Sequence, residues 1–64
     1  SDAIAAYVEL IKIDAKMWDA WYGLGQLQAS SGDSASAKKT LGDLLAKNPS
    51  YEKKVEVQKI LSGL

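Results

Sequence analysis

The sequence predicts an all-α fold of four antiparallel helices. Apolar residues recur in four segments at the three- and four-residue spacing of an amphipathic helix, and no stretch alternates for long enough to form a strand. Two groups of turn residues, Ser30-Ser31-Gly32-Asp33 and Asn48-Pro49, separate the later segments. Because all the connections are short, neighbouring helices are expected to lie side by side and antiparallel.

The first two helices are expected over residues 2–13 and 17–30. Ser1 or Asp2 is suited to cap the first helix, since a short polar side chain accepts the unpaired backbone N–H groups of a first turn. One face of the first helix carries Ile4, Tyr7, Val8 and Ile11. One face of the second carries Met17, Trp21, Leu24 and Gln28.

The last two helices are expected over residues 34–47 and 51–61. Gly32 can adopt the positive φ that ends a helix, and Asp33 is a natural cap for the helix that follows. Asn48-Pro49 ends that helix, because the residue before a proline is disfavoured in the α region. Ser50 is expected to cap the fourth helix.

Composition restricts the classes of function. The 64 residues contain eight Lys, eight Asp and Glu together, and no Arg, His or Cys. A balanced charge disfavours nucleic-acid binding, and the lack of Cys excludes disulfides and thiolate metal sites. No apolar run is long enough to span a membrane. The sequence therefore predicts one small domain over residues 1–64, and it leaves the cellular compartment open.

Catalytic residues are not expected. His and Cys, the commonest general base and the strongest side-chain nucleophile, are missing. Ser36 and Ser50 each begin an S-x-x-K pattern, but both lie where a helix-capping serine is expected. The carboxylates lack the spacing of a calcium loop. We expect no enzyme activity, no cofactor and no metal site.

A repeat of 34 residues relates the two halves of the chain. A shift of this length places Ala3 on Ala37, Tyr7 on Leu41 and Leu10 on Leu44. The same shift places Trp21 on Val55, so the fourth segment is equivalent to the second. The four helices therefore form slightly less than two copies of a helix–turn–helix unit.

The repeat resembles the tetratricopeptide repeat family. The pattern of that family is carried here by Trp21, Leu24, Gly25, Ala37 and Pro49, with Gln28 in place of its Tyr and Leu41 in place of its Phe. The resemblance implies a fragment of a right-handed superhelical α-solenoid. Residues 2–14 would be the second helix of a first repeat, 17–47 a complete repeat, and 51–62 a capping helix or the first helix of the next repeat.

Small residues in the pattern have a packing explanation. Gly25 and Ala37 are expected where two helices cross closely, with the larger side chains of Trp21, Leu24, Leu41 and Leu44 filling the space on either side. A glycine within a helix costs about 0.5–1 kcal/mol relative to alanine. Gly23 has no comparable explanation beyond space for a ligand or a neighbouring helix. Trp18 either packs on the first helix or lies at an exposed edge.

The resemblance also implies a binding face. The first helix of each repeat lines a concave groove that holds a partner peptide, which here places Asp19, Tyr22, Gln26 and Ala29 on the second helix and Lys53, Glu56 and Ile60 on the fourth. Simple solvent exposure would explain the same residues. A known use of the family, the capture of a chaperone carboxylate by Lys, Asn and Arg, is disfavoured, since Tyr22, Gln26 and Glu56 replace the required groups and Arg is absent.

These observations predict a non-catalytic scaffold that binds a protein or peptide partner. The alternative is a structural element that self-associates or docks on a fused domain. For that alternative the expected surface is the face of Tyr7, Leu10 and Ile11 on the first helix. Repeat arrays generally need about three units to be stable alone, which favours such an association.

Overall fold

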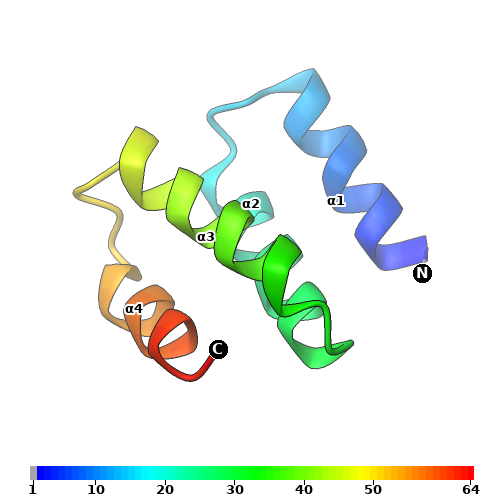
Figure 1. The fold of residues 1–64 in the computed structure, drawn as a ribbon. Helices are drawn as coiled ribbons and strands as arrows, with labels where there is room; N and C mark the ends of the chain where they lie inside the picture. Colours follow the sequence, from blue (N-terminus) through cyan, green and yellow to red (C-terminus); the bar gives the residue numbers. More distant parts are fainter. Residues whose placement is uncertain (1) are drawn as a thin grey trace.

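The computed structural model describes residues 2–64, and over this range its regular secondary structure consists of α-helices joined by turns, without strands. The helices are α1 (Asp2–Ile13), α2 (Trp18–Ser30), α3 (Ser34–Lys47) and α4 (Lys54–Ser62) (Figure 1). The predicted all-α fold with four helices is confirmed. The proposed cap at Ser1 lies outside the described residues.

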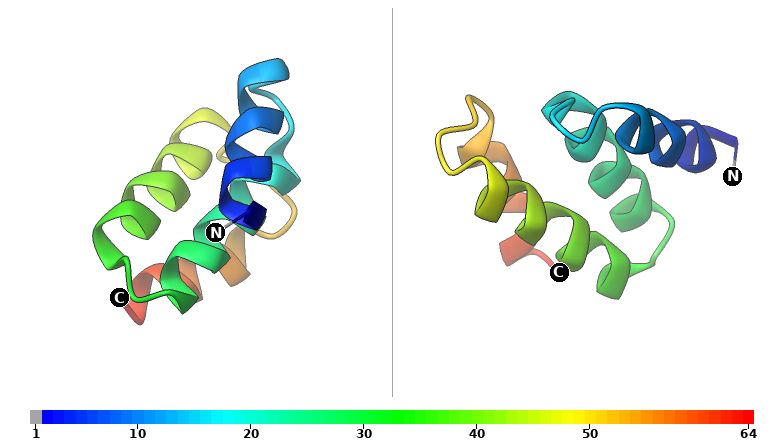
Figure 2. Two further views of the ribbon diagram at one scale, coloured as in Figure 1. Left: turned by 90° about the vertical axis from the view of Figure 1, so that its right-hand side faces the viewer. Right: turned by 90° about the horizontal axis from the view of Figure 1, so that it is seen from above.

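The α2–α3 hairpin forms the centre of the molecule. α1 packs against α2, whereas α4 packs mainly against α3 and touches the edge of α2. The two views of Figure 2 show α1 and α4 on different sides of this hairpin. Each helix thus lies against its neighbours in sequence, as expected for stacked helix–turn–helix units.

The turn between α2 and α3 follows the local sequence. Gly32 has φ of 86°, a value that favours glycine because it carries no Cβ. The side chain of Asp33 then accepts a hydrogen bond of 3.3 Å from the backbone N–H of Ser36. Both residues therefore have the roles that the sequence predicted, and α3 begins at the expected residue.

The expected start of the fourth helix was wrong by three residues. α4 begins at Lys54 rather than at 51, and Ser50 does not cap it, since its hydroxyl lies 3.4 Å from Oδ1 of Asn48. The backbone N–H of Tyr51 bonds to the carbonyl of Asn48, and that of Lys54 bonds to the carbonyl of Tyr51. Tyr51 is almost fully buried. Residues 49–53 form successive turns that place the Tyr51 ring in the core, and α4 therefore begins three residues later than expected.

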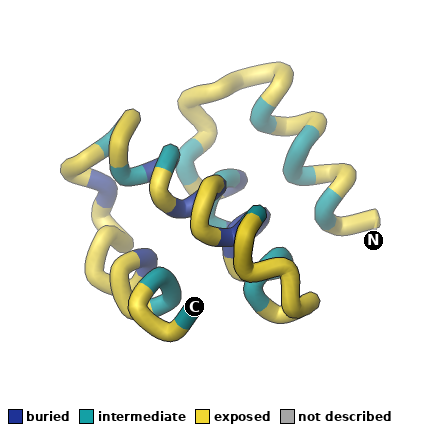
Figure 3. Tube along the Cα trace, in the orientation of Figure 1, coloured by how far each residue is buried: buried dark blue, intermediate teal, exposed yellow. Residues whose placement is uncertain are grey.

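The core lies where α3 meets α2 and α4 (Figure 3). Leu41, Leu44 and Val57 are fully buried, and Tyr51 completes their cluster. Beside this core the hydroxyl of Thr40 donates a hydrogen bond of 2.7 Å to Oε1 of Gln28. Gln28, which replaces the tyrosine of the family pattern, therefore satisfies a buried polar group that would otherwise destabilise the core.

Two glycines of α2 mark close helix contacts. A Cβ on Gly25 would overlap the side chain of Leu41 on α3, and Ala37 on α3 is fully buried. A Cβ on Gly23 would lie 2.5 Å from Cζ and 2.7 Å from Oη of Tyr7 on α1. Gly23 thus makes room for a neighbouring helix, which supplies the packing reason that the sequence alone lacked.

Candidate functional site

The candidate site is built around a contact between α2 and the α3–α4 connection. The hydroxyl of Tyr51 donates a hydrogen bond of 2.6 Å to Oδ1 of Asp19. Asp19 is an exposed residue in the first turn of α2, whereas Tyr51 is 7% exposed and packs in the core. The bond therefore fixes a surface carboxylate to a buried ring.

Tyr22 and Lys53 extend this contact along α2. The rings of Tyr22 and Tyr51 have centroids 6.3 Å apart with an interplanar angle of 60°, a geometry that favours aromatic attraction. The ammonium of Lys53 lies 5.2 Å from the centroid of the Tyr22 ring, within the range of a cation–π contact. Asp19, Tyr22 and Lys53, three of the predicted groove residues, are thus brought together through Tyr51.

Electrostatics keeps Tyr51 protonated. Burial raises the pKa of its phenol above the ordinary value, and the hydrogen bond to Asp19 raises this pKa further. The negative charges of Asp19 and Glu52 act in the same direction, because an ionised phenolate would be repelled by both. Tyr51 therefore remains a hydrogen-bond donor, and Asp19 remains its acceptor.

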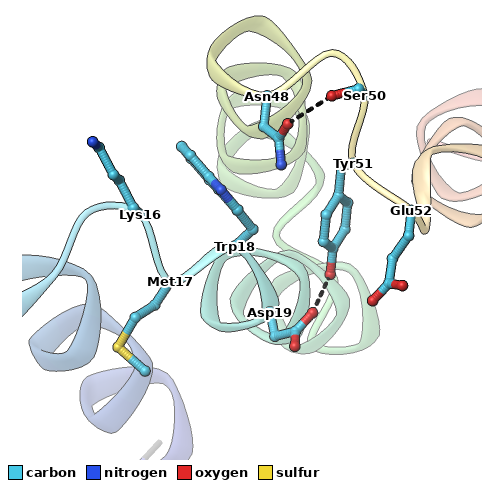
Figure 4. Close-up of a pocket in the computed structure, with 8 residues that line it drawn as sticks. All are labelled: Lys16, Met17, Trp18, Asp19, Asn48, Ser50, Tyr51 and Glu52. Carbon is cyan, nitrogen blue, oxygen red and sulfur yellow. Dashed lines mark hydrogen bonds between the residues drawn. The ribbon is translucent and has the colours of Figure 1, made fainter.

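A shallow pocket of about 600 Å³ opens beside this contact (Figure 4). The α1–α2 connection and the start of α2 supply Lys16, Met17, Trp18 and Asp19. The α3–α4 connection supplies Asn48, Ser50, Tyr51 and Glu52. Trp18 is half-buried, and its ring centroid lies 6.5 Å from that of Trp21.

The other predicted groove residues lie outside this pocket. Gln26 and Glu56 are exposed, and Ala29 is half-buried. Lys53 lies at the position just before α4 rather than within the helix, and its side chain makes no capping hydrogen bond. Asp19 is thus the one predicted groove residue that lines the pocket. Tyr22, Gln26 and Ala29 lie further along α2, whereas Lys53 and Glu56 lie at the start of α4.

Tyr51 was missed as a site residue by sequence reasoning. In the sequence it stands in the apolar stripe expected for the fourth helix and just after the proline that closes the repeat. The available sequence signal was the position of Tyr51 directly after Asn48-Pro49-Ser50, since that turn ends the preceding helix. Its partner Asp19 lies 32 residues away, and no local pattern identifies that pairing.

The predicted self-association face is only partly exposed, since Tyr7 and Ile11 are half-buried and Leu10 is exposed. Tyr7 is half-buried against Gly23, because the absence of a side chain there lets its ring approach α2. Ile11 is half-buried and lines a second groove of about 230 Å³ with Val8, Trp21 and Leu24. Leu10 is 36% exposed, and Ile13 at the end of α1 is 79% exposed. The large apolar side chains that α1 exposes therefore lie in its C-terminal half.

Trp21 connects α2 to both of its neighbours. It is half-buried against the core, and its indole N–H donates a hydrogen bond of 3.0 Å to the carbonyl of Ala15. The ammonium of Lys47 lies 5.8 Å from the centroid of its ring. Leu24, Leu41 and Ala37 are buried beside it, whereas Pro49 is exposed in the turn after α3.

Two further observations concern ligands and membranes. Over residues 2–64 no group of three or more acidic, His or Cys side chains is placed to hold a metal ion. None of the helices in the described part of the chain is long and apolar enough to cross a membrane.

The arrangement defines an α-helical protein built from stacked antiparallel hairpins. Comparison with protein families agrees with this class, since the model of the tetratricopeptide repeat matches residues 1–59. The chain belongs to the tetratricopeptide repeat family, as the residues of the pattern indicated. No curated protein and no solved structure matches the chain. Members of the family are generally protein–protein interaction modules and are typically non-catalytic scaffolds.

Proposed function

We propose that this chain binds an extended segment of a partner protein along α2, from the pocket at Asp19 across Tyr22 to Gln26. The observation that carries the proposal is the set of contacts around Tyr51, which holds Asp19 and Tyr22 in place before any partner arrives. Side chains that are already ordered lose less conformational entropy on binding, so the same contacts give a higher affinity.

The chemistry of this surface suits a peptide. Asp19 retains acceptor capacity beyond its bond to Tyr51, since an ionised carboxylate has about four lone-pair sites. Tyr22 offers a half-buried ring, and the exposed amide of Gln26 can both donate to and accept from a peptide backbone. Aromatic anchors of this kind account for much of the binding energy in protein interfaces.

Peptide display tests the proposal. A random heptapeptide library is selected on the immobilised chain, and the affinity of selected peptides is measured by calorimetry for the wild type and for variants. We expect Tyr22→Ala to weaken binding about tenfold or more, as truncation of an anchor residue does. Gln26→Ala should weaken it less.

Gln58→Ala is the matched control, because Gln58 is also an exposed glutamine but lies on α4. It should leave the affinity unchanged. Circular dichroism must show that each variant keeps its helices. Selected peptides that bind Tyr22→Ala and Gln26→Ala as tightly as the wild type would contradict the proposal.

Self-association is a second candidate, favoured by the exposure of Ile13 and Leu10 at the end of α1. An isoleucine that is 79% exposed beside another large apolar residue gains free energy when a second molecule covers it. Sedimentation over a range of concentrations tests this function, and Ile13→Lys should shift any dimer to monomer. A monomer at every concentration would contradict it, whatever the result of the peptide selection.

A further inference from the structure

The pocket beside Asp19 combines an apolar wall with two carboxylates. The half-buried Trp18 forms the apolar side, whereas the side chain of Met17 points away from the Trp18 ring and from the carboxylates (Figure 4). Asp19 and Glu52 lie near the Tyr51 hydroxyl, and Figure 4 shows the two carboxylates on either side of it. An occupant that matches both parts needs an aliphatic stem and a cationic head.

We infer that this pocket receives an arginine side chain of the partner peptide. The inference rests on the proposed function and specifies the chemistry of the partner at one end of the binding face. A pocket of about 600 Å³ also leaves space for the residues beside that arginine.

Charge complementarity supports a basic occupant. Neither Asp19 nor Glu52 forms an ion pair with a lysine in the part of the chain that the structure describes. Within the described residues the hydrogen bond to Asp19 comes from the neutral hydroxyl of Tyr51, and the carboxylate has no ion-pair partner there. Lys16 also lines the pocket, but its ammonium points away from both carboxylates, beyond the ring of Trp18 (Figure 4).

The aromatic wall favours arginine over other basic groups. A guanidinium is planar, stacks on aromatic rings and presents five N–H donors that can reach two carboxylates at once. Trp18 supplies a ring on which the guanidinium can stack and whose apolar surface can also contact the methylene stem. Tyr51 lines the pocket but does not offer a ring face for stacking, because it is 7% exposed.

Nuclear magnetic resonance on the whole chain tests the inference. The probes are the pentapeptide acetyl-Gly-Gly-Arg-Gly-Gly-amide and its counterpart with neutral citrulline in place of arginine. We expect the arginine peptide to shift the indole N–H resonance of Trp18 and the amide resonances of Glu52 in a saturable way. The Trp21 indole, which is bonded to the carbonyl of Ala15, should move little. Added salt should weaken the binding.

Charge variants locate the effect. Asp19→Asn keeps an acceptor for the Tyr51 hydroxyl but removes the charge, and Glu52→Gln does the same for the other carboxylate. Each substitution should lower the affinity for the arginine peptide about fivefold, which corresponds to the upper end of the energies found for exposed ion pairs. Asp43→Asn removes an equal charge outside this pocket and should have no effect. Lys16→Gln should strengthen binding, whereas an acidic occupant would be bound more weakly by that variant.

Equal shifts with the citrulline peptide, or no shift at Trp18 with the arginine peptide, would overturn the inference. Its failure is distinguishable from failure of the proposed function, because Tyr22 does not line this pocket. Display-selected peptides that lose affinity on Tyr22→Ala but not when their arginines are replaced by citrulline would leave the proposed function standing and refute the arginine pocket.

Discussion

The hydroxyl of Tyr51 bonds to the carboxylate of Asp19 at 2.6 Å, and this contact joins the turn after α3 to the start of α2. It couples the stability of the fold to the geometry of the proposed binding face. The ring of Tyr51 contributes to the core, while its hydroxyl orients a carboxylate at the surface.

Replacement of Tyr51 by Phe should lower the free energy of unfolding by about 1 kcal/mol. A hydrogen bond to a charged group contributes about 1.5–3 kcal/mol, and the exposure of Asp19 reduces that value. Urea unfolding followed by circular dichroism measures the change. Tyr7→Phe is the matched control and should be close to neutral, since the Tyr7 hydroxyl forms no hydrogen bond within residues 2–64. Equal stability of the two variants would refute the role of the Tyr51 hydroxyl.

Alkaline pH should remove the same stabilisation. Burial, and then the bond to Asp19, raises the pKa of Tyr51 in the folded chain, so the folded state holds this proton more tightly than the unfolded state does. The contribution is complete below the ordinary tyrosine pKa of about 10 and is lost as the pH rises from there towards the higher folded value. The difference in unfolding free energy between wild type and Tyr51→Phe should therefore shrink above about pH 10. A difference that stays constant across this range would contradict the assignment.

Substitution of Gly25 by Ala should destabilise the chain. The new Cβ would overlap the fully buried Leu41, and such overpacking costs about 1–3 kcal/mol. Gly42→Ala on α3 is the matched control, because its Cβ would meet no described atom within 4 Å. That variant should gain about 0.5–1 kcal/mol from helix propensity. Thermal and urea unfolding of both variants should give effects of opposite sign, and effects of the same sign would refute the close contact at Gly25.

Substitution of Gly23 by Ala should loosen the attachment of α1. Its Cβ would approach the end of the Tyr7 ring, which can move more easily than the buried Leu41. The loss should thus be about 1 kcal/mol, smaller than at Gly25. In a double-mutant cycle with Tyr7→Ala the two losses should not add, because removal of the ring also removes the overlap. Additive losses would show that Gly23 and Tyr7 act independently.

The helix ends that the sequence predicted correctly are set by turn and capping residues close to them in the chain. Gly32 and Asp33 determine the α2–α3 turn through one residue's φ angle and one hydrogen bond across three residues. Asn48 and Pro49 end α3 for an equally local reason. The bounds of α1 and α3 were therefore predicted correctly. The repeat of 34 residues predicted which helices are equivalent, and its pattern residues indicated the family that the match over residues 1–59 shows.

The sequence by itself thus determined the helices, their order and the family, because helix periodicity and capping depend on residues within about four positions of one another. Tertiary structure decided the rest. In the folded chain α4 begins only at Lys54, the ring of Tyr7 packs against Gly23, and the Tyr51 hydroxyl bonds to Asp19. These outcomes depend on which side chains fill the space between packed helices. The shape of that space is set by residues far apart in the sequence, so no local pattern reveals it.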